Sequence, residues 1–226
     1  MQAIVLAAGQ GTRLRSVSAS KPLTQVGGRP LLHHILERLA VAGVTRPLVV
    51  TGYAREAVEP VVAAWPGATA LFNPRWAEPN GVSLLAAAPH LEPRALLVMA
   101  DHLASPALYA AVAAAMVDPA GLVLGIDRRL GHPWVDEEDV TRVATRRGLI
   151  TAIGKGIATY DCYDTGVFLI TPGLTAALAG LAAPGLSDGV RALARNGRAA
   201  TVDVSAHDWL DIDDPRALGF SGALLG

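Results

Sequence analysis

The chain begins with a run of apolar residues that stops at two closely spaced glycines. Ala3-Ile4-Val5-Leu6 forms the run, and Gly9 and Gly11 follow after two alanines. A short, continuous apolar run bounded by glycine is typical of a buried parallel strand. Glycines beyond such a strand let backbone N–H groups approach an anion, because no side chain stands between them. The N-terminus therefore predicts the first strand of a parallel sheet and an anion-binding loop at its carboxyl end.

Two cations follow this loop and fit the site of a triphosphate. Arg13 lies just beyond the glycines, and Lys21 comes soon after. Only Lys21 and Lys155 among the 19 basic residues are lysine, so lysine is retained where its chemistry differs from that of arginine. A lysine is a compact point charge, whereas arginine is a planar fork. We therefore expect both lysines to be active-site groups.

The loop does not match either of the two common glycine motifs. A dinucleotide-binding fingerprint needs a third glycine where Leu14 stands, and a P-loop needs a Gly-Lys-Ser/Thr ending. An ordinary strand-to-helix turn that uses glycine for its geometry is the alternative, but it leaves Arg13 and Lys21 unexplained. A dehydrogenase is disfavoured by the same Leu14.

Composition narrows the classes of partner. The 226 residues are 51% hydrophobic and carry a net charge of −1, without a block of basic residues. Nucleic acids and membrane surfaces demand a concentrated cationic face, so we expect small-molecule substrates and no nucleic acid. No apolar run reaches the roughly 18 residues of a membrane span, and no secretory signal is seen, so we expect a cytoplasmic protein without membrane insertion. The single cysteine, Cys162, is interpreted as a packing residue.

Strands and helices alternate through the first half of the chain. Strands are predicted at 2–7, 47–51, 69–72 and 95–100, and helices at 31–42, 54–63, 83–90 and 106–117. From about residue 121 the pattern is richer in strands, with strands at 122–127, 141–145, 149–153, 164–171 and 200–204 and helices at 172–181, 188–196 and after 215. This order predicts an α/β fold, a Rossmann-like three-layer α/β/α sandwich with a mixed, mostly parallel sheet. Gly9 and Asp101 then lie on the same rim of that sheet.

The spacing Leu-x-Ala-Gly-x-Gly-x-Arg followed by Lys-Pro-Leu resembles the sugar-phosphate nucleotidyltransferase superfamily. The resemblance implies one domain over residues 1–226, with a nucleotide-binding half at about 1–120 and an acceptor-binding half at about 121–226. It implies catalytic roles for Arg13 and Lys21. It also implies nucleotide contacts from Leu6, Ala7, Ala8, Gly9, Gly11, Thr12, Asn73, Asn80, Gly81 and Ser83. The alternative to nucleotide contact is that Asn80 or Ser83 caps the helix that follows.

Nucleotidyl transfer requires charge neutralisation, and the resemblance implies Mg²⁺ as the cofactor. Asp101 follows a buried strand, where the superfamily has a metal ligand. The segment Trp209 to Pro215 resembles a second metal-binding segment and offers Asp211 and Asp213. The two lie at period two on an extended segment and point to the same side, and we rank Asp213 slightly ahead. Asp214 is expected to cap the helix that starts at Pro215.

Further segments resemble the inositol-1-phosphate cytidylyltransferases, which couple CTP to L-myo-inositol-1-phosphate to give CDP-inositol. The matching segments are Asp101-His102, 136–143, 153–155, 160–168 and 186–190. The resemblance implies acceptor contacts from His102, Lys155, Asp164, Thr165 and Asp188, with Lys155 on the phosphate. Glu138 or Asp139 is a further candidate for the acceptor hydroxyls, but the acidic run 136–139 fits a solvated turn equally well. A separate membrane synthase downstream is expected, and a homodimer stays open.

Other acceptors and roles remain as alternatives. Arg142 stands where a lysine is expected, which leaves room for another acceptor. A phosphocholine or phosphonate enzyme would need an aromatic cage, for which Trp134, Tyr160 and Tyr163 are the candidates. Hexose- or heptose-phosphate transferases are further alternatives. A non-catalytic nucleotide-binding module is disfavoured, because every expected cation and carboxylate is present.

Overall fold

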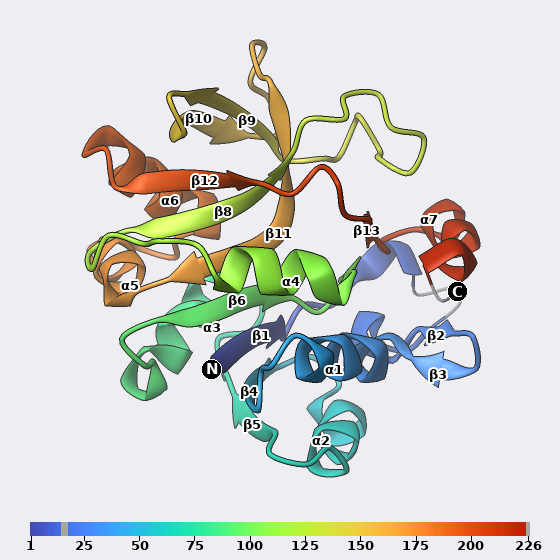
Figure 1. Cartoon of the computed structure of the whole chain (residues 1–226). Coiled ribbons are helices and arrows are strands. Elements are labelled where there is room, and N and C mark those ends of the chain that lie inside the picture. The colour runs from blue at the N-terminus through green and yellow to red at the C-terminus, as the bar shows by residue number, and fades with distance from the viewer. Residues whose placement is uncertain (15–17, 225–226) are drawn as a thin grey trace.

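The computed structural model describes residues 1–14 and 18–224, and its centre is a nine-stranded mixed sheet (Figure 1). The strand order is β5-β4-β1-β6-β11-β8-β12-β10-β9. The strands are β1 (Gln2–Ala7), β4 (Arg46–Thr51), β5 (Thr69–Phe72), β6 (Ala95–Met99), β8 (Leu122–Asp127), β9 (Arg142–Arg146), β10 (Leu149–Gly154), β11 (Cys162–Ile170) and β12 (Ala199–Asp203). The first four in the order run parallel, whereas β11 runs antiparallel to both β6 and β8. The predicted α/β class with a mixed sheet is confirmed.

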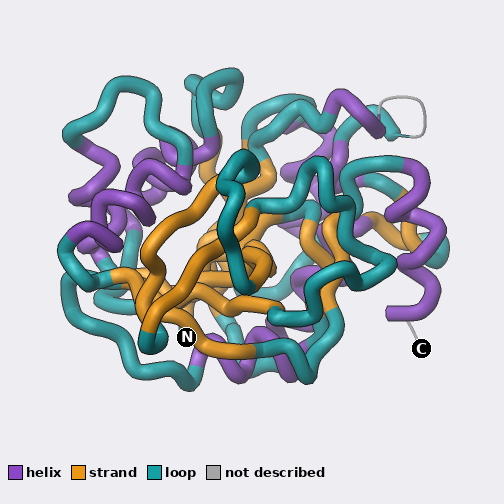
Figure 2. Tube along the Cα trace, turned by 90° about the horizontal axis from the view of Figure 1, so that it is seen from above, coloured by secondary structure: helices purple, strands orange, loops and turns teal. Residues whose placement is uncertain are grey.

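Helices cover both faces of the sheet, because alternate residues of its strands point to opposite sides. Ala3 and Val5 of β1 belong to the core under α1 (Leu31–Val41), α2 (Arg55–Ala63) and α4 (Pro106–Ala113). Ile4 and Leu6 belong to the core under α3 (Asn80–Ala87), α5 (Pro172–Ala179) and α6 (Leu186–Arg195). In Figure 1, α1 and α4 lie in front of the sheet. Viewed from above, strands occupy the middle of the molecule with helices around them (Figure 2).

The structure adds short elements that the sequence pattern did not predict. These are β2 (Gln25–Val26), β3 (Arg29–Pro30), β7 (His102–Ala104) and β13 (Trp209–Asp211), beside the expected last helix α7 (Pro215–Phe220). Strands of two or three residues are too short to show a period. Helix α3 begins at Asn80 rather than 83, directly after Pro79. Helix α4 ends at Ala113 rather than 117, since an alanine-rich pattern does not mark its own end.

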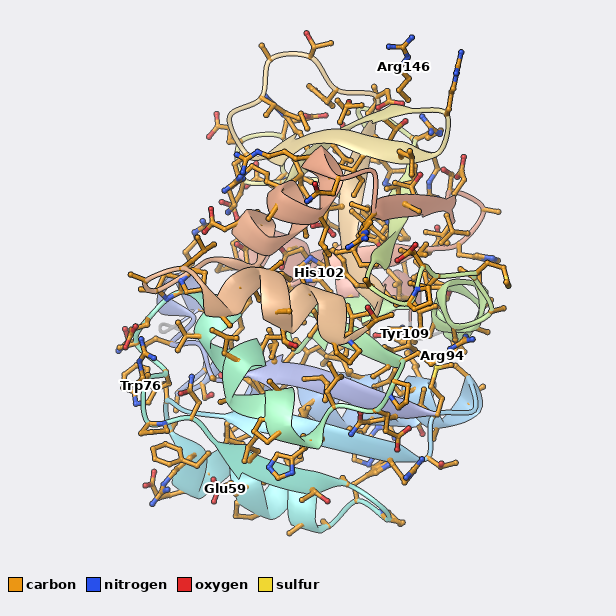
Figure 3. All side chains as sticks on the ribbon, turned by 90° about the vertical axis from the view of Figure 1, so that its left-hand side faces the viewer. Glu59, Trp76, Arg94, His102, Tyr109 and Arg146 are labelled. Atoms are coloured by element: carbon orange, nitrogen blue, oxygen red, sulfur yellow. The ribbon has the colours of Figure 1, made fainter. Side chains whose placement is uncertain are left out.

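Strand β13 brings the end of the chain to the carboxyl ends of β1 and β6. It pairs antiparallel with β7, and Asp211 lies opposite His102. The Ile212 N–H donates to the carbonyl of Asp101 at 2.8 Å. Figure 3 labels His102 between Glu59 of α2 and Arg146 of β9, which mark opposite ends of the molecule. The chemistry-bearing residues of both halves therefore meet near His102.

Candidate active site

A two-lobed cleft follows the carboxyl ends of these strands. The smaller lobe has a volume of about 270 Å³ and the larger about 410 Å³. The smaller lobe is lined by the end of β1, the glycine loop and the start of α3. The larger lobe is lined by residues of the segment 134–141 together with β11, β13 and α7. Five residues line both lobes: Gly11, Lys21, Asn80, Met99 and Asp101.

Lys21 lies at the junction of the two lobes. Its Nζ donates to Asp101 Oδ2 at 2.7 Å and lies 3.6 Å from Asp211 Oδ1, and the side chain is only 14% exposed. Burial acts against the charged form, but the carboxylates of Asp101 and Asp211 outweigh it and raise the pKa of Lys21. Lys21 therefore holds a permanent positive charge between two carboxylates.

Gly11 makes room for this lysine. It adopts a positive φ of 57°, and a Cβ built on it would lie 2.5 Å from the Cβ of Lys21. Any larger residue would be strained in its backbone and would also collide with Lys21. The glycine is thus required by the packing of the lysine as well as by the shape of the loop.

Asp101, His102 and Asp211 form a compact cluster beside Lys21. His102 Nδ1 is 2.7 Å from Asp101 Oδ1 and 3.9 Å from Asp211 Oδ1. Burial favours protonation of Asp101, but Lys21 and His102 hold its pKa well below its ordinary value. Burial opposes charge on His102, but Asp211 and Asp101 raise its pKa to about 9. Burial and the neighbouring Asp101 raise the pKa of Asp211.

The carboxylates of this cluster have the donor chemistry of a divalent cation site. Ligand atoms of Asp101, His102 and Asp211 lie within 4.8 Å of one another, as do those of Asp139, Asp211 and Asp213. Asp211 Oδ1 is buried without a hydrogen-bond partner, so an acceptor atom is left free to bind a cation. Hard oxygen donors suit Mg²⁺. The observed residues therefore fit such an ion.

A second charged network closes one side of the cleft. Arg13 donates to both carboxylate oxygens of Asp139 at 2.8 and 2.9 Å and to Asp213 at 2.5 Å. Lys155 Nζ donates to Asp139 Oδ1 at 2.5 Å. The hydrogen bonds from Arg13 and Lys155 outweigh burial and hold the pKa of Asp139 well below its ordinary value. Asp139 thus links Arg13 with Lys155, two cations that the sequence singled out and that come from opposite halves of the chain.

Comparison with known proteins decides the family. Residues 3–160 match the MobA-like NTP transferase domain. The chain belongs to this family. The predicted resemblance to nucleotidyltransferases is thereby confirmed, and the chain is an enzyme of the nucleotidyltransferase type.

Relatives of this MobA-like domain cover nearly its whole length. The "Bifunctional IPC transferase and DIPP synthase" of Rubrobacter xylanophilus is 32% identical, over 99% of this chain and 51% of that protein. The Aquifex aeolicus protein of the same name is 27% identical, over 94% of this chain and 49% of that protein. The chain thus spans about half the length of the curated relatives it matches. Within residues 1–14 and 18–224, we find no helix with the length and apolar character needed to cross a membrane.

Solved structures show the same fold. The inositol-1-phosphate CTP transferase from T. maritima superposes with a TM-score of 0.87 and 25% identity, over 98% of this chain and 94% of that one. A glucose-1-phosphate thymidylyltransferase from Bacillus anthracis, described as putative in its own name, superposes with a TM-score of 0.79 at 17% identity, over 99% and 94%. The match to the Bacillus anthracis protein, at 17% identity, shows a shared fold alone.

The structure places most of the predicted nucleotide-binding residues around the smaller lobe. Leu6, Ala7, Ala8, Gly9, Gly11, Asn80 and Ser83 line it. Three of the predicted residues have partners within the protein. Asn73 Nδ2 donates to Ser83 Oγ at 3.0 Å, and Asn80 Oδ1 accepts from the N–H of Leu186 at 2.8 Å. These bonds give the side chains a structural role, so their contact with a base stays a prediction.

Gly81 and Thr12 are two further residues that were predicted to contact the nucleotide. A Cβ on Gly81 would lie 2.5 Å from the Pro184 carbonyl oxygen, so close helix packing explains this glycine. The prediction that Gly81 lets a base approach is therefore not needed to account for it. The side chain of Thr12 lies outside the described part of the structure.

The predicted acceptor residues divide into two groups. His102, Lys155 and Asp164 line the larger lobe. Asp164 accepts from the Gly166 N–H at 2.7 Å, and burial raises its pKa to about 6. By contrast, Thr165 is fully buried and donates to the Gly125 carbonyl, while Asp188 accepts from the Gly185 N–H and pairs with Arg191. Packing and helix capping account for these last two side chains, so their contact with an acceptor stays a prediction.

The structure also shows where Asp211 and Asp213 lie relative to Asp101. The pairing of β7 with β13 sets Asp211 beside Asp101, whereas Asp213 lies against Arg13. Burial and the charge of Asp211 raise the pKa of Asp213 to about 6. Asp211 therefore belongs to the cluster of Asp101, and which of the two carboxylates binds a metal ion stays a prediction.

Sequence reasoning missed several lining residues of the larger lobe. Val135, Asp136, Trp209 and Arg216 line it, and Asp139 is its central carboxylate. The one available signal for Asp139 was its place in an acidic run inside a segment resembling the cytidylyltransferases. That signal narrowed the acceptor candidates in the run to Glu138 and Asp139 without choosing between them.

Proposed function

We propose that this domain is a Mg²⁺-dependent cytidylyltransferase that couples CTP to L-myo-inositol-1-phosphate, giving CDP-inositol and pyrophosphate. The observation that carries the proposal is the position of Lys21 and Asp101 in the lining of both lobes. A nucleotide in the smaller lobe and a phosphorylated acceptor in the larger lobe would meet at these two residues. The name of the T. maritima structure and those of the bifunctional relatives support the choice of substrates.

The reaction then consists of positioning and charge neutralisation. A phosphate oxygen of the acceptor attacks the α-phosphorus of CTP, and the bond from that phosphorus to the bridging oxygen of the β-phosphate breaks. The electron pair leaves with pyrophosphate. Lys21, fixed between two carboxylates, donates to the oxygens that gain charge in the transition state.

Asp101 and Asp211 would hold the magnesium ion, with Asp213 and Asp139 next to them. When bound, the ion supplies positive charge at the phosphates. Arg13 is exposed on the loop and faces the same network, so it is placed to meet the β- and γ-phosphates. Lys155 lines the larger lobe and shares the carboxylate of Asp139 with Arg13, and we assign it to the acceptor phosphate. Both cations would exchange Asp139 for phosphate oxygens.

A choline-type acceptor is disfavoured by the aromatic side chains themselves. The Arg142 guanidinium already lies over the Tyr160 ring, 4.7 Å from its centroid. The phenols of Tyr160 and Tyr163 donate to Glu137. Trp134 is left among the three cage candidates as a lining residue of the larger lobe. Tyr160 and Tyr163 are not among the lining residues of either lobe, so the aromatic cage that a quaternary ammonium needs would have to form without them.

The deciding experiment measures pyrophosphate release with Mg²⁺. CTP, UTP, ATP, GTP and dTTP are each paired with inositol-1-phosphate, phosphocholine, 2-aminoethylphosphonate, glucose-1-phosphate and a heptose phosphate, and Asp101→Asn serves as the inactive control. We expect release confined to CTP with inositol-1-phosphate. Release with a different pair would overturn the substrate assignment, and equal release by Asp101→Asn would overturn the metal site. The single-domain organisation, the downstream synthase and the homodimer stay predictions.

A further inference from the structure

A buried carboxylate lies behind the cleft and has no part in the mechanism above. Asp127, at the end of β8, is 1% exposed. It accepts from the indole Nε1 of Trp209 at 2.8 Å and from the backbone N–H of Arg129 at 2.8 Å. The guanidinium of Arg129 adds donors at 2.9 and 3.1 Å. Both oxygens of Asp127 are thus satisfied, one of them by Trp209.

Strand β13 depends on such anchors for its position. It has three residues and pairs with β7 alone, outside the nine-stranded sheet. The segment that leads into it is held from the side of β8, where Arg129 donates to the carboxylate of Asp208 at 2.9 Å and to the carbonyl of His207 at 3.0 Å. Asp127 anchors the first residue of the strand, Trp209. A two-stranded ribbon of this length has little stability of its own.

Trp209 connects this anchor to the carboxylate cluster. Its ring stacks on the imidazole of His102 with a centroid distance of 5.9 Å and an interplanar angle of 3°. His102 in turn contacts Asp101 through Nδ1 at 2.7 Å. Asp211 follows Trp209 by two residues, so both side chains leave β13 on the same side. A rotation of the indole would remove the ring that packs on His102 and would shift the strand that carries Asp211.

We propose that Asp127 is a positioning residue, which fixes the indole of Trp209 and thereby the orientation of His102 and Asp211 at the metal-binding cluster. The inference rests on the proposed metal-dependent function. Outer-shell hydrogen bonds of this kind orient the groups that bind a metal, and their loss typically costs 10- to 100-fold in affinity or activity. Asparagine at 127 keeps the size of the side chain but has one acceptor oxygen for two demanding donors, Trp209 and Arg129.

The test compares Asp127→Asn, Trp209→Phe and the double variant with a matched control. Trp209→Phe keeps an aromatic ring over His102 but removes the N–H that Asp127 accepts. Asp208→Asn is the control, because it removes the 54% exposed partner of the same Arg129 and leaves Asp127 and Trp209 in contact. Binding of Mn²⁺ to the substrate-free protein is followed by electron paramagnetic resonance, and thermal melting checks each fold.

We expect each single variant to raise the dissociation constant for Mn²⁺ about tenfold, the double variant to do no more, and Asp208→Asn to stay within about twofold. In the pyrophosphate assay, the Mg²⁺ concentration for half-maximal rate should rise by a similar factor while the KM for CTP stays within about twofold.

Unchanged Mn²⁺ affinity in folded variants, or additive effects in the double variant, would overturn the proposal. Should Asp127→Asn fail to fold, Trp209→Phe tests it alone. Mn²⁺ binding is measured without substrate, so a wild-type protein inactive on every substrate pair overturns the proposed function without deciding this inference.

Discussion

Lys21 is the residue whose surroundings define its chemistry most sharply. It lies between Asp101 and Asp211, and replacing it by alanine removes the charge that faces the reacting phosphates. We expect Lys21→Ala to lower the rate of pyrophosphate release several hundredfold, since a preorganised donor of this kind contributes a few kcal/mol to the transition state. The requirement for Mg²⁺ should not increase, because the cation that competes for Asp101 and Asp211 is gone.

Lys21→Arg is the matched variant for this prediction. It keeps the charge, but a planar guanidinium replaces the compact ammonium that donates to Asp101 at 2.7 Å and lies 3.6 Å from Asp211, so this geometry must change. We expect it to recover less than about a tenth of the wild-type rate. Circular dichroism checks that both variants fold. A folded Lys21→Ala protein with near-normal turnover would refute the catalytic role.

Gly166 sets how closely β11 approaches His102. Its φ is +74°, and a Cβ would lie 2.5 Å from the imidazole Cδ2. Gly148 has a similar φ of +78° but nothing within 4 Å, so Gly148→Ala measures backbone strain without a collision. We expect Gly148→Ala to lower the free energy of unfolding by about 1–2 kcal/mol and to leave activity intact. Gly166→Ala should lower it further and also reduce turnover, because His102 must move. Urea unfolding and the pyrophosphate assay together check this, and equal losses with normal turnover would contradict it.

Among the elements, the long buried strands could be predicted from sequence and the short ones that carry the site could not. The strand at β6 shows as the apolar run from Ala95 to Met99, which is buried on both faces. Strand β13 has three residues, and its pairing with β7 depends on a contact between distant parts of the chain. No local pattern encodes such a pairing. The position of Asp211 beside Asp101 has the same cause.

Helix α3 shows how an element boundary changes the interpretation of a residue. Because the helix begins at Asn80, Ser83 lies in its first turn, where its hydroxyl accepts from Asn73 at the end of β5. We expect Ser83→Ala to lower the free energy of unfolding by about 1–3 kcal/mol, since the amide of Asn73 would stay buried without its acceptor. The KM for CTP should change less than about threefold.

Urea unfolding and steady-state kinetics separate the two roles of Ser83. Thr175→Val is a suitable comparison, because Thr175 donates to the Pro172 carbonyl within α5, outside both lobes. Its loss of stability should come without any change in KM. A large rise in the KM for CTP for Ser83→Ala, with stability unchanged, would instead establish a direct contact with the base.

For the whole molecule, the site is assembled from segments that only the complete sheet brings together. Arg13 meets Asp139 across 126 positions of the chain and Asp213 across 200. The sequence predicted that Gly9 and Asp101 share one rim, because the ends of parallel strands meet there. It offered Asp139 only as an alternative to Glu138, since an acidic side chain in a loop looks the same whether it faces solvent or a cation.

The free energy of unfolding of the whole protein should depend on pH through the thiol of Cys162. The thiol lies fully buried on β11, and its burial, with the nearby charge of Asp161, raises its pKa to about 12 from an ordinary value of 9.0. Between these values the unfolded chain loses the proton while the folded chain keeps it. The stability that the neutral thiol contributes is therefore fully present below pH 9 and is lost as the pH rises towards 12, by about 1.4 kcal/mol per pH unit.

Cys162→Ala removes this contribution, whereas Tyr163, whose pKa burial raises to about 12, titrates in both proteins. Urea unfolding of the two proteins from pH 8 to pH 11 should give curves that converge, the wild type losing stability faster above pH 9. Parallel curves, or rapid alkylation of the folded protein at pH 8, would show that the thiol is not held in this buried state.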